Sequence, residues 1–305
     1  MTGLARRRRL ASLEPRLLWI FGSPRSGSTW LVNLLAAHER VAKVDEPGIG
    51  AHLGLALGAL NGLDPRDPDR YRLFDYRHAS PHYFFSRQHE DAWRPALRRL
   101  LLERLAAQAG SAAVVAIKEP NGSEGADLVM SALPRSRLLL LVRDPRDVLD
   151  SELDSVQEGG WAISAVPGFE APDRLSYLRR RAHMWRCRAE VVRRAYDAHS
   201  PALRRIVRYE DLRADPERVV AGLAEWLDLE AGPLAEAARR TAFDRLPPES
   251  RGRGRFARAA RPGLWRANLT PEEQEAITAI VGRQLAELGY EAEPAAPRAT
   301  SDVSG

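Results

Sequence analysis

The feature that most constrains this chain is a short apolar segment that runs directly into a loop rich in glycine and serine. Residues 17–21 read LLWIF, a continuous apolar run that is typical of a strand buried on both faces. Residues 22–27 read GSPRSG, and residues 29–37 then have helical character. A loop between a strand and a helix can turn its backbone N–H groups towards an anion at the helix N-terminus. The alternative is an ordinary turn after a strand.

Similar signals along the chain predict an α/β fold. Further buried strands are expected at residues 113–117, 137–142 and 205–208. Helices are expected from residue 144 and over about 172–199, 215–227 and 270–288, where capping residues and prolines mark several of the starts. Short strands that alternate with longer helices favour a three-layer fold, in which helices flank a parallel sheet.

The expected organisation is a single domain over residues 16–290. Residues 1–15 form a loose basic lead-in, and residues 291–305, which are rich in proline, alanine and serine, are expected to be disordered. Residues 48–112 and 156–172 do not follow the strand–helix pattern. They are rich in aromatic residues, histidine, glycine and proline, which indicates insertions over the carboxyl edge of the sheet.

The basic charge is almost entirely arginine. The chain carries 46 basic and 41 acidic residues, for a net charge of +5. Only two of the basic residues are lysines, Lys43 and Lys118. This preference indicates GC-rich codon usage, so the net charge says little about nucleic acid as a partner. It also makes each lysine worth explaining.

Other features exclude whole classes of protein. The single cysteine, Cys187, rules out an intramolecular disulfide framework and a cysteine-rich zinc site. No apolar run approaches the roughly 18–20 residues that a membrane helix needs. The arginines at 6–9 imitate the start of a signal peptide, but residues 14–16 (EPR) interrupt the apolar segment that should follow. We therefore expect a soluble, cytoplasmic protein.

The loop has the spacing of a Walker A loop without its lysine. Gly22 and Gly27 lie five residues apart and Thr29 supplies a hydroxyl, but Ser28 stands where the lysine would be. Arg25 supplies a cation inside the loop instead. A kinase must neutralise a triphosphate and hold Mg²⁺. A sulfuryl group carries one negative charge fewer than a phosphoryl group and its transfer need not use a metal, so the loop suits sulfuryl transfer better.

A second anion site is predicted at the end of the strand at 137–142. Arg143 follows this strand, and Ser151 lies eight residues later, two turns along the expected helix. A planar guanidinium and a hydroxyl in these places can converge on one phosphate, and each charge-assisted hydrogen bond contributes roughly 1.5–3 kcal/mol. Arg146 lies in the same stretch, and we expect it on a solvated helix face.

Two stretches, SPRSGSTWL at 23–31 and RDPRDVLDS at 143–151, resemble the phosphate-binding motifs of the sulfotransferases that use 3′-phosphoadenosine 5′-phosphosulfate (PAPS). The resemblance implies a P-loop NTPase-like fold and a reaction that requires no metal. Trp30 stands where cytosolic members stack a tryptophan on adenine; its other interpretation is a helix residue that faces the core. The residues implied around the 5′-phosphosulfate are Arg25, Ser26, Gly27, Ser28 and Thr29.

The resemblance also assigns the 3′-phosphate and adenine sites. Arg143 and Ser151 match the family's 3′-phosphate motif, and Tyr209, in the segment VRYEDL, is implied near the adenine. A stretch beginning at Arg258 is similar, more loosely, to the C-terminal loop that closes over the 3′-phosphate, with Arg261 as the second choice. A disordered basic loop is the alternative for both arginines.

The second lysine distinguishes the branches of this family. Lys118 ends an expected strand and is followed by Glu119 and Pro120, whereas the cytosolic steroid and phenol sulfotransferases have Lys-Thr-His here, with the histidine as base. The pattern is closer to the Lys-Asp-Pro of the tyrosylprotein type. In that branch, and in the bacterial trehalose type, the base is a glutamate just after the first helix.

Glu46 matches that glutamate in position. The resemblance therefore implies Glu46 as the general base, with Lys118 and Arg25 stabilising the leaving group as charge builds on its oxygen. Glu119 and His38 are the alternative bases. The other interpretation of Glu46 is a loop carboxylate paired with one of many arginines.

The acceptor side carries the least specific signal. Residues 71–93 are rich in aromatic side chains, which suits a small hydroxylated acceptor of aromatic or lipophilic character. Packing of this segment onto the sheet explains the same residues equally well. Its histidines at 78, 82 and 89 lack a regular ligand spacing, so no metal site is expected.

The sequence thus favours a sulfotransferase that moves the sulfuryl group of PAPS to a hydroxyl of a small molecule by in-line displacement and releases 3′-phosphoadenosine 5′-phosphate (PAP). The nearest alternative enzyme is a metal-dependent P-loop kinase. A non-catalytic basic protein that binds nucleic acid is the alternative from another class, although no nucleic-acid-binding motif is present.

Overall fold

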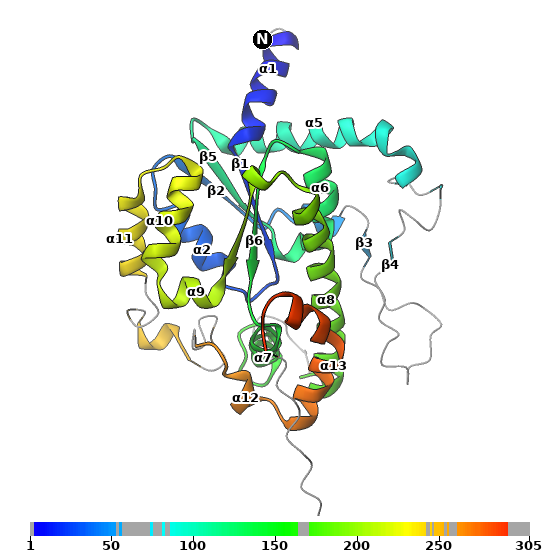
Figure 1. Ribbon diagram of the computed structural model, residues 1–305, viewed down its shortest axis with the longest axis vertical. Helices are drawn as coiled ribbons and strands as arrows, with labels where there is room; N and C mark the ends of the chain where they lie inside the picture. Colours follow the sequence, from blue (N-terminus) through cyan, green and yellow to red (C-terminus); the bar gives the residue numbers. More distant parts are fainter. Residues whose placement is uncertain are drawn as a thin grey trace, which may run out of the picture.

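The centre of the molecule is a five-stranded parallel sheet (Figure 1). The structure is a computed structural model, and it describes residues 3–52, 55–56, 74–75, 81–82, 86–163, 171–241, 245, 247–252, 255 and 261–291. The strand order is β2-β5-β1-β6-β7, which leaves β2 and β7 at the edges. The strands are β1 (Leu17–Gly22), β2 (Val41–Asp45), β5 (Val114–Lys118), β6 (Arg137–Val142) and β7 (Arg204–Arg208). A separate antiparallel pair joins β3 (Leu55–Ala56) and β4 (Phe74–Asp75).

Helices cover both faces of the sheet, which confirms the predicted three-layer α/β fold. Side chains of β1 alternate between the two faces: Leu18 and Ile20 pack in one apolar cluster, and Trp19 and Phe21 in the other. The first cluster is covered by α2 (Ser28–Leu35), α10 (Pro216–Leu227) and α11 (Ala231–Arg240). The second is covered by α5 (Glu90–Ala109), α6 (Ala126–Ala132) and α8 (Arg174–Ala198).

A third apolar cluster lies at the carboxyl ends of the strands. It joins α7 (Pro145–Val156), α12 (Trp265–Asn268) and α13 (Pro271–Glu287) with the first half of α8. The predicted helix starts are confirmed, because Asp144 caps α7, Asp215 caps α10, and Thr270 forms a capping box with Glu273 at α13. Shorter helices complete the fold: α3 (Ile49–His52), α9 (Tyr209–Ala214), η2 (Arg87–His89), η3 (Pro120–Gly125), η4 (Pro201–Leu203) and η6 (Pro248–Ser250).

The prediction of a loose lead-in at residues 1–15 is wrong from residue 3 onward. Gly3–Leu13 forms α1 and Glu14–Arg16 forms the 3₁₀ turn η1. Glu14 is fully buried, where it pairs with Arg98 of α5 and accepts a hydrogen bond from the Arg135 amide at 2.8 Å. These long-range contacts hold the end of α1 against the molecule. Of the expected disordered tail, residues 291–305, all but the first residue lie outside the described residues.

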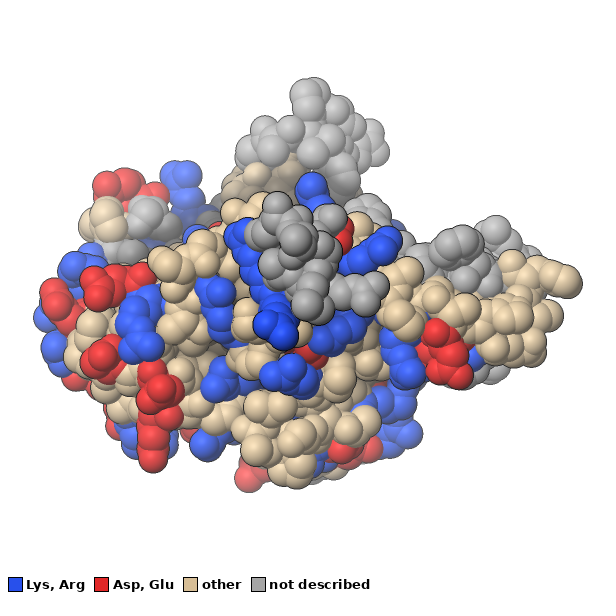
Figure 2. Space-filling model, turned by 90° about the horizontal axis from the view of Figure 1, so that it is seen from above, with Lys and Arg blue, Asp and Glu red and all other residues tan. Residues whose placement is uncertain are grey.

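Two further elements depart from the predicted pattern. Residues 41–45 form the edge strand β2, which was not predicted. Residues 48–112, predicted as an insertion, include α5, whose apolar side packs in the core beside α1 and α6. Seen from above, basic side chains are dense near the middle of this face, and acidic side chains lie mainly towards its left, right and lower edges (Figure 2). Within the described part of the chain, no helix has the length and apolar character needed to cross a membrane.

Candidate active site

The glycine- and serine-rich loop connects β1 to α2, as predicted. Gly27 has a left-handed backbone with φ of 87°, and a Cβ there would lie 2.6 Å from Cδ2 of Tyr209, so only glycine fits. Arg25 is also left-handed, with φ of 64°. The Leu31 amide donates to the Gly27 carbonyl at 3.0 Å, which starts the helix directly after the loop. The ring of Tyr209 therefore lies on the loop, where burial raises the pKa of its hydroxyl.

The two predicted phosphate elements meet at Arg25. Its Nε donates to the Ser151 hydroxyl on α7 at 3.1 Å, and its carbonyl accepts from Nη1 of Arg143 at 2.7 Å. The Arg143 guanidinium also lies 4.4 Å from the centre of the Tyr209 ring. Nε of Arg143 is buried and has no hydrogen-bond partner within the described part of the chain. The loop and the end of β6 thus form one cationic corner.

A second cluster is centred on Lys118 at the end of β5. The Lys118 side chain is 6% exposed, and its Nζ lies 3.0 Å from the Thr29 hydroxyl, 2.8 Å from Oε1 of Glu46 and 3.1 Å from Oδ1 of Asp45. Strand pairing creates this cluster, because Asp45 of β2 lies in register with Lys118. Partial burial by itself would raise the pKa of Asp45, but hydrogen bonds from Lys43 and Lys118 outweigh burial and lower it.

Of the three candidate bases, the structure brings Glu46 to this cluster in an accessible position. Its side chain is 39% exposed, and its amide donates to the Lys118 carbonyl at 2.9 Å. Glu119 is fully buried, and burial raises the pKa of its carboxyl to about 7. His38 is buried elsewhere, with Nε2 2.7 Å from a carboxylate oxygen of Glu230 and Nδ1 accepting from the Arg40 amide.

Trp30 was predicted either to stack on adenine or to face the core, and its position has features of both. It is half-buried and packs against the apolar cluster beneath α10 and α11. Its Nε1 donates to the Thr241 hydroxyl at 3.1 Å, so the end of α11 orients the indole ring beside the loop. Thr241 was not predicted from the sequence, because it lies 211 residues further along the chain.

The prediction that Arg146 lies on a solvated helix face is wrong. Arg146 is 2% exposed, with Nη2 2.8 Å from Oδ2 of Asp144 and its guanidinium 4.0 Å from the centre of the Trp265 ring. From the sequence, no role was assigned to its neighbour Asp147 either. This buried carboxylate accepts from the amides of Gly263 at 2.7 Å and Trp265 at 3.2 Å, and burial raises its pKa. Both residues anchor the C-terminal segment to α7.

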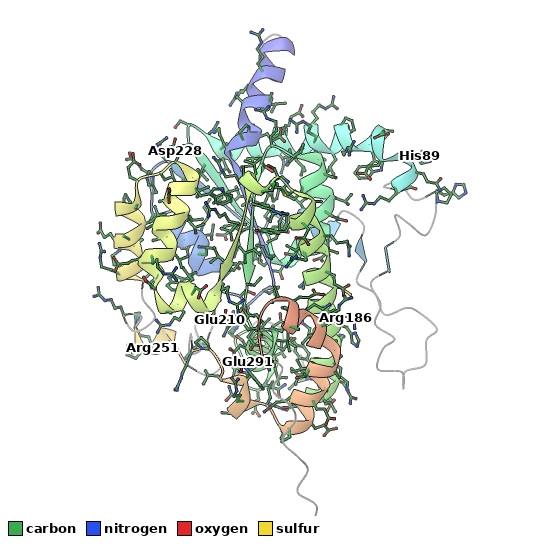
Figure 3. The ribbon with its side chains drawn as sticks, viewed as in Figure 1. His89, Arg186, Glu210, Asp228, Arg251 and Glu291 are labelled. Atoms are coloured by element: carbon green, nitrogen blue, oxygen red, sulfur yellow. The ribbon has the colours of Figure 1, made fainter. Side chains whose placement is uncertain are left out.

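The C-terminal arginines are only partly described. Arg261 is exposed at the start of the segment that Asp147 anchors, and Arg258 lies outside the described residues. The last helix is held to the same end of the sheet through Glu210, which accepts from the Asp144 amide at 3.0 Å and from the Tyr290 hydroxyl at 2.9 Å (Figure 3).

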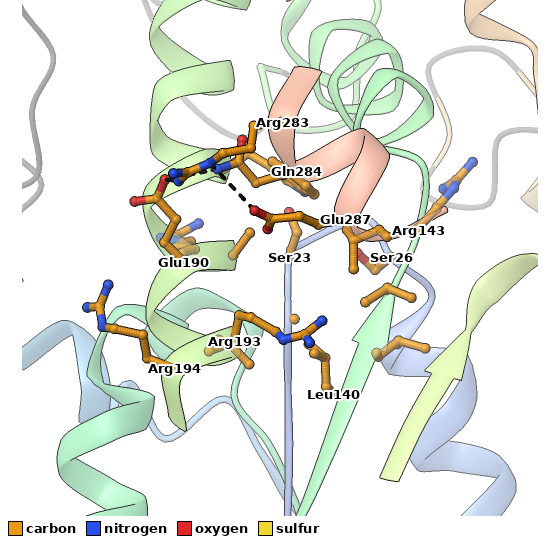
Figure 4. A pocket seen from close by; sticks show the side chains of 18 residues that line it. Ser23, Ser26, Leu140, Arg143, Glu190, Arg193, Arg194, Arg283, Gln284 and Glu287 are labelled. Atoms are coloured by element: carbon orange, nitrogen blue, oxygen red, sulfur yellow. Dashed lines mark hydrogen bonds and ion pairs between the residues drawn. The ribbon is translucent and has the colours of Figure 1, made fainter. Parts of the chain in front are cut away.

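A cavity of about 320 Å³ adjoins the loop (Figure 4). It lies between α8, α13 and the carboxyl ends of β1 and β6, and Ser23, Ser26 and Arg143 line it. On its far side Glu190 accepts hydrogen bonds from Arg283 at 2.5 Å and Gln284 at 2.9 Å. The cavity therefore borders both predicted phosphate elements.

The predicted acceptor side is described only in part. Trp93 is a core residue, because it is 7% exposed and its Nε1 donates to the Ser86 carbonyl at 2.9 Å. Trp161 is 42% exposed, with the Arg25 guanidinium 5.7 Å from the centre of its ring, and it was not singled out from the sequence. His89 lies at the outer end of α5 (Figure 3), and the described residues contain no group of three side chains able to hold a metal ion. His78 and the side chains of most other aromatic residues between 71 and 85 are outside the described set.

Comparison with solved structures confirms the predicted fold. The crystal structure of sulfotransferase STF9 from Mycobacterium avium matches with a TM-score of 0.55 at 19% identity, covering 94% of this chain and 80% of that one. The crystal structure of mouse sulfotransferase SULT7A1 complexed with PAP matches with a TM-score of 0.52 at 14% identity, covering 93% of each chain.

Sequence comparisons identify the family. Nodulation protein NoeE of Sinorhizobium fredii (strain NBRC 101917 / NGR234) is 28% identical over 306 residues, which cover 91% of this chain and 66% of that protein. The chain thus spans just under two thirds of the length of this relative. A model of the sulfotransferase family matches residues 18–233, from β1 into α11. The chain belongs to the sulfotransferase family, as its motifs predicted.

Proposed function

We propose that this protein transfers the sulfuryl group of PAPS to a hydroxyl group of a small-molecule acceptor. The observation that carries the proposal is the contact of Lys118 with both Thr29 and Glu46. One buried ammonium thereby joins a phosphate loop that lacks the Walker lysine to an accessible carboxylate. The family match and the PAP held by the mouse enzyme of the same fold support the choice of PAPS.

The residues around the loop fit a nucleotide with two anionic ends. Arg25 and the backbone of residues 26–29 are the proposed ligands of the 5′-phosphosulfate. Arg143 and Ser151 are those of the 3′-phosphate, with Arg258 from the C-terminal loop. The buried Nε of Arg143, which lacks a partner among the described atoms, fits an anionic ligand. Aromatic faces for the adenine are proposed at Trp30 and Tyr209.

Glu46, Lys118 and Arg25 have different roles in the proposed reaction. Bound PAPS would supply the sulfuryl group, whose sulfur gains a bond to the acceptor oxygen and loses its bond to the 5′-phosphate oxygen. Glu46 accepts the proton of the acceptor hydroxyl, which is a contribution of about 10²–10⁴-fold for a positioned base. Lys118 and Arg25 stabilise the negative charge that builds on the leaving oxygen.

The proposed acceptor is a small hydroxylated molecule with an aromatic or lipophilic body. Trp161 supports this class, because it presents an exposed ring beside Arg25.

The test is an assay of sulfuryl transfer from PAPS to a panel of phenols, sugars, lipids and peptides. Mass spectrometry identifies the products, and the release of PAP is measured in the same reactions. The expected result is a sulfate ester on one class of acceptor, with no added metal. Phosphate transfer from ATP·Mg²⁺ to the same panel, without sulfate transfer, would overturn the proposal in favour of a kinase. Binding of PAP without any transfer would identify a non-catalytic member of the family.

A further inference from the structure

The carboxylate of Glu46 is held at both of its oxygens. Oε1 lies 2.8 Å from Nζ of Lys118, and Oε2 accepts a hydrogen bond from Nδ2 of Asn121 at 2.7 Å. Lys118 was predicted for this site, whereas no role has been assigned to Asn121. We propose that Asn121 is a positioning residue that orients the Glu46 carboxylate for removal of the acceptor proton. This inference rests on the proposed function.

The Glu46 carboxylate needs a second hydrogen-bond partner if it is to act as a positioned base. Glu46 is 39% exposed and lies at the end of edge strand β2, with a left-handed φ of 43°. With Lys118 alone, the carboxylate would be free to rotate about a single contact. A general base must keep its lone pair within hydrogen-bond reach of the hydroxyl, and a small misplacement costs much of its effect. Asn121 supplies the second contact as a neutral donor, so it fixes the second oxygen without adding a positive charge.

The backbone of Asn121 is anchored to α8. Its side chain lies at the surface on η3, while its carbonyl accepts from Nη2 of Arg188 at 3.2 Å. Nε of Arg188 lies 2.9 Å from Oε2 of Glu124, and these two side chains are 8% and 6% exposed. A buried ion pair therefore fixes η3, the turn that carries Asn121, to α8.

The segment after Glu46 packs directly on the same turn. A Cβ on Gly50 of α3 would lie 1.6 Å from the carbonyl oxygen of Gly122, and a Cβ on Gly125 would lie 2.4 Å from the Gly50 Cα. These backbones approach too closely for any side chain between them. The segments that carry Glu46 and Asn121 are thus held together by glycine contacts, which keeps the hydrogen bond between them in place.

The test is a double-mutant cycle with Asn121→Ala, Glu46→Gln and the double variant, using an acceptor that the wild-type enzyme sulfates. Because Asn121 acts through Glu46, we expect Asn121→Ala to lower kcat by about tenfold in the wild-type background and by less than about twofold in the Glu46→Gln background. The Kd for PAP, measured by calorimetry, should stay within about twofold throughout, since neither residue is a proposed nucleotide ligand.

Two further variants sharpen the cycle. Asn121→Asp keeps the size of the side chain but cannot donate as a carboxylate and repels Glu46, so we expect a larger loss of kcat than with alanine. Asn33→Ala is the matched control, because Asn33 is also exposed and its side chain contacts Lys43 rather than Glu46. This control should retain the wild-type kcat.

Equal losses of kcat in the two backgrounds would overturn the inference, because a merely structural residue costs the same with or without the base. A wild-type kcat in Asn121→Ala would overturn it as well. The proposed function fails separately, if the wild-type protein transfers no sulfate to any acceptor.

Discussion

Nζ of Lys118 lies 2.8 Å from Oε1 of Glu46 and 3.0 Å from the Thr29 hydroxyl, so one buried ammonium connects the start of α2 to the end of the edge strand. In a Walker A loop the lysine comes from the loop itself. Here Arg25 is the cation within the loop, and Lys118, from the neighbouring strand β5, is a second one. Lys118 lies between Thr29 and the Glu46 carboxylate, which is the basis for its proposed role beside the leaving oxygen.

Removal of the proposed base should affect turnover and spare nucleotide binding. We expect Glu46→Gln to lower kcat by about 10²–10⁴-fold, because glutamine keeps the shape of the side chain but cannot take up a proton. Steady-state kinetics with PAPS and calorimetric titration with PAP measure the two effects. A kcat near the wild-type value would exclude Glu46 as the base.

The two lysines of the chain form a natural pair of test and control. Lys118→Ala should lower kcat by about 10²-fold or more, since it removes the cation nearest to the proposed leaving oxygen. Lys43→Ala should have little effect on kcat, because Lys43 is 34% exposed and pairs with Asp45. Comparable losses of kcat in the two variants would contradict a specific role for Lys118.

Ser151 should contribute to nucleotide affinity through its hydroxyl. Ser151→Ala removes both the proposed phosphate ligand and the partner of Arg25 at 3.1 Å. A hydrogen bond to a charged group contributes about 1.5–3 kcal/mol, so we expect the Kd for PAP to rise by about 10–100-fold.

Ser155→Ala is the control on the same helix, because the Ser155 hydroxyl donates to the Glu152 carbonyl within α7. Calorimetry should find its Kd for PAP unchanged. An unchanged Kd in Ser151→Ala would mean that the 3′-phosphate is bound elsewhere.

Burial of Glu119 should make stability depend on pH. Burial raises the pKa of this carboxyl from 4.5 to about 7 in the folded protein. Folding therefore favours the protonated form of Glu119. The free energy of unfolding that this preference contributes is complete below pH 4.5 and is lost as the pH rises through 7. Relative to the wild type, Glu119→Gln should gain about 3 kcal/mol in the free energy of unfolding across this window.

Urea unfolding of both proteins at pH 4.5 and pH 8 measures this difference. Glu39→Gln, at an exposed position, is the control and should follow the wild type at both pH values. A constant difference between Glu119→Gln and the wild type would show that Glu119 keeps its charge when folded.

Local sequence signals were sufficient for the loop, most strands and the helix starts. A continuous apolar run predicts β1 and β6, and capping residues predict the starts of α7 and α13, because each depends on neighbours within a few residues. Edge strand β2 escaped detection because Lys43 and Asp45 interrupt its short apolar pattern. The helix α5 was missed within a range whose loop-like composition obscured its apolar side.

Site residues that depend on distant partners could not be predicted. Arg146 has the spacing of a solvated helix residue, but its guanidinium lies on the ring of Trp265, from a segment far along the chain. Thr241 and Asp147 likewise acquire their roles from partners that the fold brings together. The position of Lys118 at the end of a buried strand was predictable, and its rarity as one of two lysines made it a candidate, whereas the contact of Asn121 with Glu46 requires the turn η3.

The most direct test of the account is calorimetric titration of the wild-type protein with PAP and, separately, with ATP·Mg²⁺. The cationic corner formed by Arg25 and Arg143, with Ser151 beside it and no Walker lysine in the loop, predicts saturable PAP binding that does not require Mg²⁺ and much weaker binding of ATP. Tight binding of ATP·Mg²⁺ without binding of PAP would contradict the account.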